Sequence, residues 1–214
     1  MLLATLIGDL VGSRLLPDRA SAQEQLVEVL AQVNGEVAAV QPLETTIGDE
    51  FQGAYAELAS AVQASLLIRL RLLPLVDSRY GVGLGDVTVF ESGRTPLSQD
   101  GPGWWAAREG IEQVQSREGR RASARGTRTW FVDRSGEPAL IAPAMNAFLL
   151  CRDESVGMMG ERARRLLLGW LQGRTQSELA EQEGISQSAV SQALGRSGAY
   201  ALRDAQQALA GERG

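Results

Sequence analysis

Two aspartates that each follow a glycine are the residues of this chain best placed to do chemistry. Asp9 ends an apolar run that begins at Leu2, and Asp49 lies in a turn between two further apolar runs. Each carboxylate could project from the end of a strand beside flexible glycine backbone. Two such carboxylates can share hard cations such as Mg²⁺ or Mn²⁺, and those cations can hold a triphosphate. Asp9 and Asp49 are therefore candidate metal ligands in a site for a phosphorylated ligand.

The composition removes most other chemistries. The chain has no histidine, and all 21 of its basic residues are arginine. The lack of histidine excludes Ser–His and Cys–His hydrolases and histidine metal sites. The lack of lysine excludes the lysine-bearing phosphate loop and Schiff-base catalysis. Cys151 is the single cysteine and cannot form an internal disulfide. Carboxylates, arginines, hydroxyl groups and bound metal remain for any catalysis.

Length and charge indicate a globular protein of two parts. A chain of 214 residues can hold one domain of ordinary size and a small module. No apolar run is long enough to span a membrane, and residues 1–7 lack the basic flank of a signal peptide. We therefore expect a cytoplasmic protein with no membrane partner. The net charge of −5 gives no overall attraction to nucleic acid, so any DNA contact must be local.

The first part of the chain alternates strand-like and helical patterns. Apolar residues recur at helical spacing in some segments and form shorter runs between them. Because strands and helices are interleaved within one unit, the order predicts an α+β sandwich of ferredoxin-like type. We expect strands over residues 2–7, 37–47, 51–55, 79–90 and 129–132, and helices over residues 21–33, 57–73 and 100–115.

Beyond residue 137 the patterns are helical only. We expect one helix over residues 138–151 and another over residues 154–171. The chain is therefore predicted to have an α+β domain at 1–136, a connecting helix at 137–153 and a small all-α domain at 154–214, with the boundary near residues 152–160.

An arginine-rich segment lies before the last predicted strand. Residues 117–128 contain five arginines and one acidic residue, Glu118. We interpret this segment as a solvated loop or hairpin tip, and a phosphate-facing patch is the alternative.

Residues 174–196 carry the signals of two short helices joined by a tight turn. Thr175 and Glu178 form a capping box at the start of the first helix. Gly184 permits the turn, and Ser186 can cap the second helix. This ordered set predicts a DNA-binding helix-turn-helix, with a helical hairpin for packing or dimerisation as the alternative. The side chains left to face base edges and phosphates are Gln187, Ser188, Ser191, Gln192 and Arg196.

Residues 1–132 resemble the SatD family of bacterial proteins and, more distantly, the class III nucleotide cyclases. In cyclases the first strand ends in an aspartate before a hydrophobic-hydrophobic-glycine turn, which Asp9-Leu10-Val11-Gly12 resembles. A hairpin then presents a second Gly-Asp, and Gly48-Asp49-Glu50-Phe51 also resembles the diguanylate cyclase signature without its first glycine. The later stretches that resemble cyclase motifs are the glycine-spaced strand at 80–87 and the segment 104–108, which is similar to an Asn-x-Ala-Ala-Arg helix.

The resemblance implies roles for these residues. Asp9 and Asp49 would hold Mg²⁺ or Mn²⁺, and Arg108 would face the triphosphate and be the catalytic residue of an active enzyme. Because a cyclase site is completed across a dimer, the resemblance also implies a homodimer. The turn that would cradle the phosphates of a nucleotide consists of Leu10, Val11, Gly12, Ser13 and Arg14.

Two departures from the cyclase pattern bear on catalysis. Trp104 stands at the asparagine position, and the lysine that many cyclases use to select adenine does not occur in the chain. We therefore expect a nucleotide sensor rather than an active cyclase, with Trp104 or Trp105 stacking on a base. The alternatives are core packing for the tryptophans, and turn and cap chemistry for Asp9 and Asp49.

The sequence thus predicts a DNA-binding transcriptional regulator whose cyclase-like domain senses a nucleotide or a cyclic-nucleotide-type ligand. Its expected partners are DNA, that small molecule and a second copy of the chain. The alternative is a metal-dependent nucleotidyl cyclase, or another phosphoryl-transfer enzyme, that carries a DNA-binding module. A third possibility is an interaction scaffold with a vestigial pocket.

Overall fold

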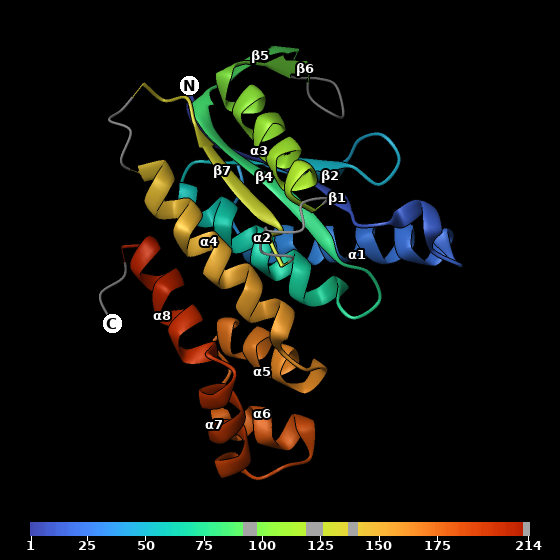
Figure 1. Ribbon diagram of the computed structural model, residues 1–214, viewed down its shortest axis with the longest axis vertical. Helices are drawn as coiled ribbons and strands as arrows, with labels where there is room; N and C mark the ends of the chain where they lie inside the picture. Colours follow the sequence, from blue (N-terminus) through green and yellow to red (C-terminus); the bar gives the residue numbers. More distant parts are fainter. Residues whose placement is uncertain (92–97, 119–125, 137–140, 212–214) are drawn as a thin grey trace. The chain divides into compact units, whose positions relative to one another are not determined.

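The computed structural model describes residues 1–91, 98–118, 126–136 and 141–211. The chain forms two compact units, Met1–Asp153 and Glu154–Gly214, and the division falls inside one helix, α4 (Ile141–Met158). Figure 1 shows the first unit as a sheet covered by helices and the second as helices alone. None of the helices in the described part of the chain has the length and apolarity that a membrane-spanning segment needs.

The first unit is built on a five-stranded sheet, counted over the described residues, in the order β2-β3-β1-β4-β7. Neighbours among the first four strands are antiparallel, and β7 is parallel to β4. The sequence order β-α-β-β-α-β of the first six elements is that of a ferredoxin-like sheet, and the predicted α+β class is confirmed. The elements are β1 (Leu2–Leu10), α1 (Arg19–Glu36), β2 (Gln41–Thr45), β3 (Phe51–Tyr55), α2 (Leu58–Leu72), β4 (Ser78–Asp86) and β7 (Thr129–Asp133).

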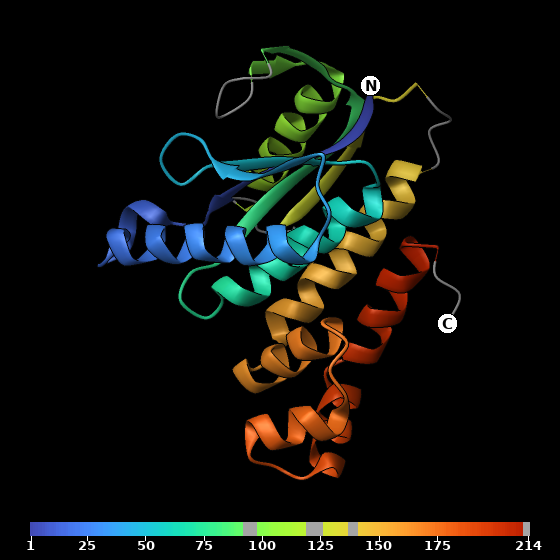
Figure 2. The ribbon, with the colours of Figure 1, turned by 180° about the vertical axis from the view of Figure 1, so that it is seen from behind.

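Helices cover both faces of this sheet. Helix α3 (Pro102–Glu118) lies on one face, and α1 and α2 lie on the other (Figures 1 and 2). Side chains alternate between the faces along β1, as in any strand. The Thr5 hydroxyl donates to the Gly103 carbonyl of α3 at 2.8 Å, and Ile7 packs with Trp104 of α3. Asp9 shares this face, whereas Leu10 points toward α1.

Both edge strands of the sheet are capped by an asparagine side chain. Asn34 of α1 donates to the carbonyl of Leu43 in β2 at 3.0 Å and accepts from its amide at 2.7 Å. Asn146 of α4 makes the same pair of bonds with Phe131 of β7, both at 2.8 Å. Unpaired edges are sites of strand addition, so these caps protect the sheet from pairing with other chains.

The structure corrects several expectations about element bounds. The strand expected over 2–7 continues to Leu10, and the strand expected over 37–47 is confined to Gln41–Thr45. The strand expected over 79–90 divides into β4 and β5 (Thr88–Glu91), and β5 pairs with β6 (Ser98–Asp100) in a separate small sheet. The helix that contains Cys151 continues to Met158 as α4, and residues 138–140 lie outside the described residues. The helix expected over 154–171 is interrupted, because α5 (Glu161–Leu171) starts anew with Gly160 as its N-cap residue.

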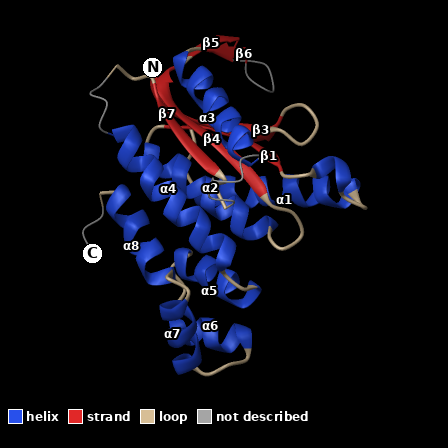
Figure 3. Ribbon diagram, viewed as in Figure 1, coloured by secondary structure: helices blue, strands red, loops and turns tan. Residues whose placement is uncertain are grey.

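The second unit contains α5, α6 (Gln176–Glu183), α7 (Gln187–Arg196) and α8 (Ala199–Leu209), which Figure 3 shows as consecutive helices. Each of these helices buries an apolar stripe toward the others, as expected for amphipathic helices around a small core. The most deeply buried members of that core are Leu166, Leu167, Leu179, Val190, Leu194 and Ala199.

Candidate functional site

A pocket of about 410 Å³ opens in the first unit between the start of α1 and the β2–β3 turn. Its volume falls within the range of small-molecule sites. Asp49 and Ser13, both predicted site residues, are part of its wall, and Arg19 of α1 supplies a positive charge. The complete lining is Leu10, Ser13, Leu16, Arg19, Ala20, Ala22, Gln23, Gly48 and Asp49.

Two glycines in left-handed conformations shape this pocket. Gly12 has a φ of 67° and turns the chain from β1 into a 3-10 helix, η1 (Ser13–Leu15). Gly48 has a φ of 68° and turns β2 toward β3 beside Asp49. Residues with a Cβ atom rarely adopt this conformation, so the sequence specifies both turns locally. The Asp18 side chain then caps α1 by accepting from the Ser21 amide at 2.9 Å.

The backbone amides that could bind phosphate are fewer than the sequence predicts. The amide of Val11 donates to the Asp77 carbonyl at 2.8 Å, and the amide of Leu15 donates to the Gly12 carbonyl at 2.9 Å. Within the described parts of the chain, no group accepts a hydrogen bond from the amides of Gly12, Ser13 and Arg14. Of the predicted cradle over Leu10 to Arg14, the Val11 amide is therefore engaged within the protein. Free amides at the start of a helical turn are suitable donors to an anion.

Asp49 and Arg108 come from opposite sides of the site. The Asp49 carboxylate is half-buried in the pocket wall, and no described residue forms a hydrogen bond or ion pair with it. The next residue, Glu50, holds Arg108 of α3 through two hydrogen bonds of 2.6 and 2.8 Å. These bonds, aided by charge attraction, outweigh partial burial and raise the pKa of Arg108. Arg108 is thus engaged by the hairpin next to Asp49.

Asp9 lies on the other face of the sheet from the pocket. Arg79 of β4 donates to its two carboxylate oxygens at 2.6 and 3.1 Å, and Gln115 of α3 donates at 3.2 Å. Within the described residues, no group of three or more Asp, Glu, Cys or His side chains is arranged to hold a metal ion. Because guanidinium nitrogens occupy both oxygens of Asp9, this donor set does not fit a cation shared by Asp9 and Asp49.

Trp104 and Trp105, the two tryptophans expected to stack on a base, have different environments. Trp104 is only 8% exposed and packs in the core with Leu3, Ile7 and Val87, so its ring is not presented to a ligand. Trp105 is 51% exposed, and its indole nitrogen donates to Asp100 at 2.6 Å. Trp104 is therefore a core residue, as the alternative interpretation expected. Of the two, Trp105 has the exposed ring.

The sequence did not predict a network of arginines and carboxylates that is connected to Asp9 by ion pairs. Asp77 accepts from Arg69 at 2.8 Å and from Arg128 at 2.7 Å. Asp153 accepts from the amides of Arg128 and Thr129 at 2.8 and 2.6 Å. The partners lie far apart in the sequence, so local patterns give no sign of them. Of the arginine-rich segment, residues 119–125 lie outside the described part, Arg128 belongs to this network, and Arg117 lies over the Trp130 ring at 3.9 Å.

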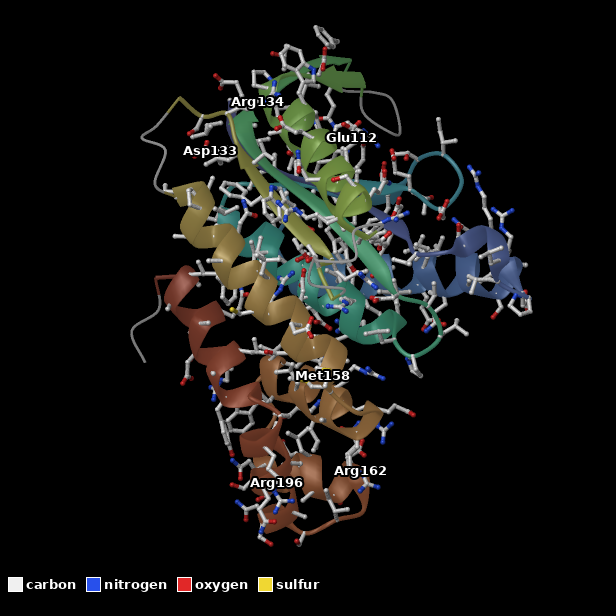
Figure 4. The ribbon with its side chains drawn as sticks, in the orientation of Figure 1. Glu112, Asp133, Arg134, Met158, Arg162 and Arg196 are labelled. Carbon is white, nitrogen blue, oxygen red and sulfur yellow. The ribbon has the colours of Figure 1, made fainter. Side chains whose placement is uncertain are left out.

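The second unit brings the other predicted residues together on α6 and α7. The capping box of Thr175 and Glu178 is present, and its hydrogen bonds lower the pKa of Glu178. Gly184 ends α6 with a φ of 64°, and Ser186 caps α7 by accepting from the Ala189 amide at 3.2 Å. Of the predicted residues on α7, Gln187, Ser188, Gln192 and Arg196 are exposed, while Ser191 is half-buried and its hydroxyl lies 3.3 Å from the Tyr200 hydroxyl. Arg196, the last residue of α7, is labelled in Figure 4.

Solved structures with a similar first unit are nucleotide cyclases. A bacterial light-regulated adenylyl cyclase aligns at 14% identity with a TM-score of 0.46, covering 54% of this chain and 40% of that one. The catalytic core of a rhodopsin-guanylyl cyclase with converted specificity, in complex with ATPαS, aligns at 16% identity with a TM-score of 0.43, covering 52% and 71%. This chain thus spans well under half the length of the light-regulated cyclase.

The sequence comparisons give one assignment. No curated protein matches the chain significantly. The family model described as SatD family matches residues 3–128, which is more than half of the chain and contains both aspartates, the pocket and α3. The protein therefore belongs to the SatD family.

Proposed function

We propose that this protein is a DNA-binding transcriptional regulator whose first unit binds a nucleotide-type ligand. The observation that carries the proposal is the polar, exposed face of α7 on a helix whose opposite face is locked into a core. Val190 and Leu194 are fully buried, which fixes the orientation of that exposed face. Both ends of the intervening turn are capped, at Gly184 and Ser186.

The side chains of α7 suit the edges of base pairs. Glutamine can pair with adenine through two hydrogen bonds, and arginine can do the same with guanine. Gln192 and Arg196 are four positions apart, so they lie on the same side of the helix. Residues 154–214 carry equal numbers of arginines and acidic residues, so long-range attraction to phosphate is weak. Binding would therefore depend on α7 itself and on a dimer that presents two copies of it.

The pocket at Asp49 suits a ligand that is both an anion and a hydrogen-bond donor. Arg19 and Ser13 in the pocket wall offer donors to phosphate oxygens, and no described group accepts from the Ser13 amide. Asp49 in the same wall would repel a bare phosphate but would accept from a ribose hydroxyl or a base amino group. A nucleotide carries both kinds of group, whereas inorganic phosphate carries one.

The enzymatic alternative has less support. A cyclase or other phosphoryl-transfer enzyme needs charge neutralisation at the reacting phosphate, which metal ions and arginine can supply. In this structure Asp9 is occupied by Arg79, and Arg108 is occupied by Glu50. Incubation with nucleoside triphosphates and Mg²⁺ or Mn²⁺ separates the two functions. Product formation that disappears in Asp49→Ala would favour the enzyme.

Thermal denaturation of the full chain tests the ligand site. The probes are ATP, GTP, cyclic AMP and cyclic di-GMP, and a ligand of the folded state raises the melting midpoint by mass action. We expect at least one of them to raise the midpoint of the wild type, and Arg19→Ala to lose that shift. Arg134→Ala is the matched control, because Arg134 pairs with Glu109 outside the pocket lining. No shift with any probe, or a shift that Arg19→Ala retains, would contradict the proposal.

A further inference from the structure

Asp9 and Arg79 form a cross-strand pair near the end of β1 and the start of β4. They lie directly opposite each other in the antiparallel register of β1 and β4. The side chains are 16% and 17% exposed, and the two hydrogen bonds between them measure 2.6 and 3.1 Å. A bidentate pair of this kind is stronger and geometrically more specific than a single charged contact.

Arg79 is held in place by a second carboxylate. Its remaining terminal nitrogen donates to Glu118 of α3 at 2.6 Å, and Glu118 also lies 3.4 Å from Arg128. Burial disfavours the charge of Arg79, but the hydrogen bonds and charges of Asp9 and Glu118 outweigh burial and raise its pKa. The guanidinium is therefore a permanent cation with a fixed position, and not a mobile surface group.

The network around this pair is already neutral. Among the described residues, four carboxylates and four guanidinium groups are joined in one network of ion pairs, so their formal charges cancel without any bound metal. A divalent ion at Asp9 would add excess positive charge and would leave Arg79 with Glu118 as its single partner. Separating a partly buried ion pair carries a desolvation penalty that the new contact must offset. The members are Asp9, Asp77, Glu118, Asp153, Arg69, Arg79, Arg128 and Arg152.

We propose that the Arg79 guanidinium is the permanent cationic partner of the Asp9 carboxylate and occupies the place that a divalent ion would take on it. Arg79 is thus a positioning residue that fixes the orientation of the Asp9 carboxylate on the α3 face, where the alternation along β1 places it. The pocket then receives its ligand on Arg19 and backbone amides with no metal bridging the two aspartates. This last consequence rests on the proposed function, whereas the assignment of Arg79 to Asp9 does not.

Manganese binding to the full chain tests the assignment without any nucleotide. Titration with MnCl₂, followed by the EPR signal of free Mn²⁺, compares wild type, Asp9→Asn, Arg79→Met and the double variant. We expect wild type and Asp9→Asn to bind Mn²⁺ equally weakly. Arg79→Met should gain a site at least about tenfold tighter, because it frees the carboxylates of Asp9 and Glu118 together, and several carboxylate oxygens are needed to hold a hard cation. The double variant should lose that site. Arg134→Met, which frees the exposed Glu109, is the control for general loss of an arginine and should gain no such site.

Two results would overturn the assignment. Wild-type binding that Asp9→Asn removes would show that Arg79 yields to the metal, and unchanged binding in Arg79→Met would show that Arg79 is not what excludes it. If Arg79→Met does not fold, melting of wild type and Asp9→Asn with and without MnCl₂ decides the question. The proposal expects the same Mn²⁺ effect on both midpoints, and a rise confined to wild type would contradict it. Nucleotide and DNA binding are measured separately, so either proposal can fail alone.

Discussion

The backbone of Ala107 in α3 lies directly over Gly81 of β4, so closely that a Cβ atom at Gly81 would overlap the Ala107 carbonyl oxygen. Gly83 has the same relationship to Gly103. The alternate positions of β4 that face α3 are therefore glycines because the helix rests on the strand with no side chain between them. This close approach sets the position of α3, and with it the position of Arg108 beside Glu50.

Gly81→Ala should destabilise the first unit strongly. The added methyl meets backbone atoms of Ala107 and Ile111, which cannot rotate away, so the helix must move as a body. Overpacking of this kind costs about 1–3 kcal/mol or more. Urea denaturation followed by circular dichroism measures the loss. Gly35→Ala in α1 is the matched control, because a Cβ there meets nothing within 4 Å. It should stabilise the protein by about 0.5–1 kcal/mol. Equal effects of the two substitutions would contradict the packing account.

Asp77→Asn should destabilise the first unit in a pH-dependent way. Burial alone would raise the pKa of Asp77, but the charges and hydrogen bonds of Arg69 and Arg128 outweigh it and hold the pKa below its ordinary value. The Arg69 side chain is only 3% exposed, so loss of the charge at Asp77 leaves a buried cation poorly compensated. At neutral pH we expect a cost of about 3 kcal/mol.

The sign of the pH dependence follows from the lowered pKa. The contribution of the Asp77 charge is fully present above the ordinary value of 3.8 and is lost as the pH falls through the lower pKa of the folded state. The difference in unfolding free energy between wild type and Asp77→Asn should therefore shrink below about pH 4. Glu109→Gln, which breaks an exposed pair with Arg134, should cost less than about 1 kcal/mol. A difference that stays constant down to pH 2.5 would refute the assigned charge interaction.

Local signals in the sequence predicted elements well where the neighbours in the chain decide the conformation. The strand Phe51–Tyr55 has the expected bounds, and the left-handed glycines at 12, 48 and 184 lie at the expected turns. The capping box at Thr175 depends on residues three positions apart and was predicted for the same reason. In these segments the conformation is determined by residues that are only a few positions apart in the sequence.

The sequence could not reveal contacts that the register of the sheet creates. Arg79 is 70 positions from Asp9, and only the antiparallel pairing of β1 with β4 brings them together. The end of β4 was not predicted for a similar reason. It lies where β4 meets the start of β1, and there the Val87 amide donates to the Met1 carbonyl at 2.9 Å. The alternation along β1 also separates Asp9 from the Asp49 pocket. The two Gly-Asp pairs thus have different settings, because Gly8-Asp9 lies within β1 and Gly48-Asp49 lies in the turn between β2 and β3.

Thr175→Ala should weaken the second unit through loss of one helix cap. The Thr175 hydroxyl accepts from the Glu178 amide at 3.2 Å, and the Glu178 carboxylate accepts from the Thr175 amide at 2.6 Å. Removing such a cap typically costs about 1 kcal/mol. Hydrogen exchange of α6 amides measures it locally. Ser177→Ala, in the first turn of the same helix, is the control and should be neutral or slightly stabilising, because alanine favours helices. Equal exchange rates in both variants would contradict the role of the cap.

The most direct measurement of the central claim is selection of bound sequences from a random duplex library by the full chain. Wild type and Arg134→Ala should enrich a common sequence, because Arg134 follows β7 in the first unit and is not part of α7. Gln192→Ala combined with Arg196→Ala should lose that enrichment, since each base-pair contact contributes about 1–3 kcal/mol of discrimination. Enrichment of the same sequence by the double variant, or none by wild type at 50 mM salt, would contradict the account.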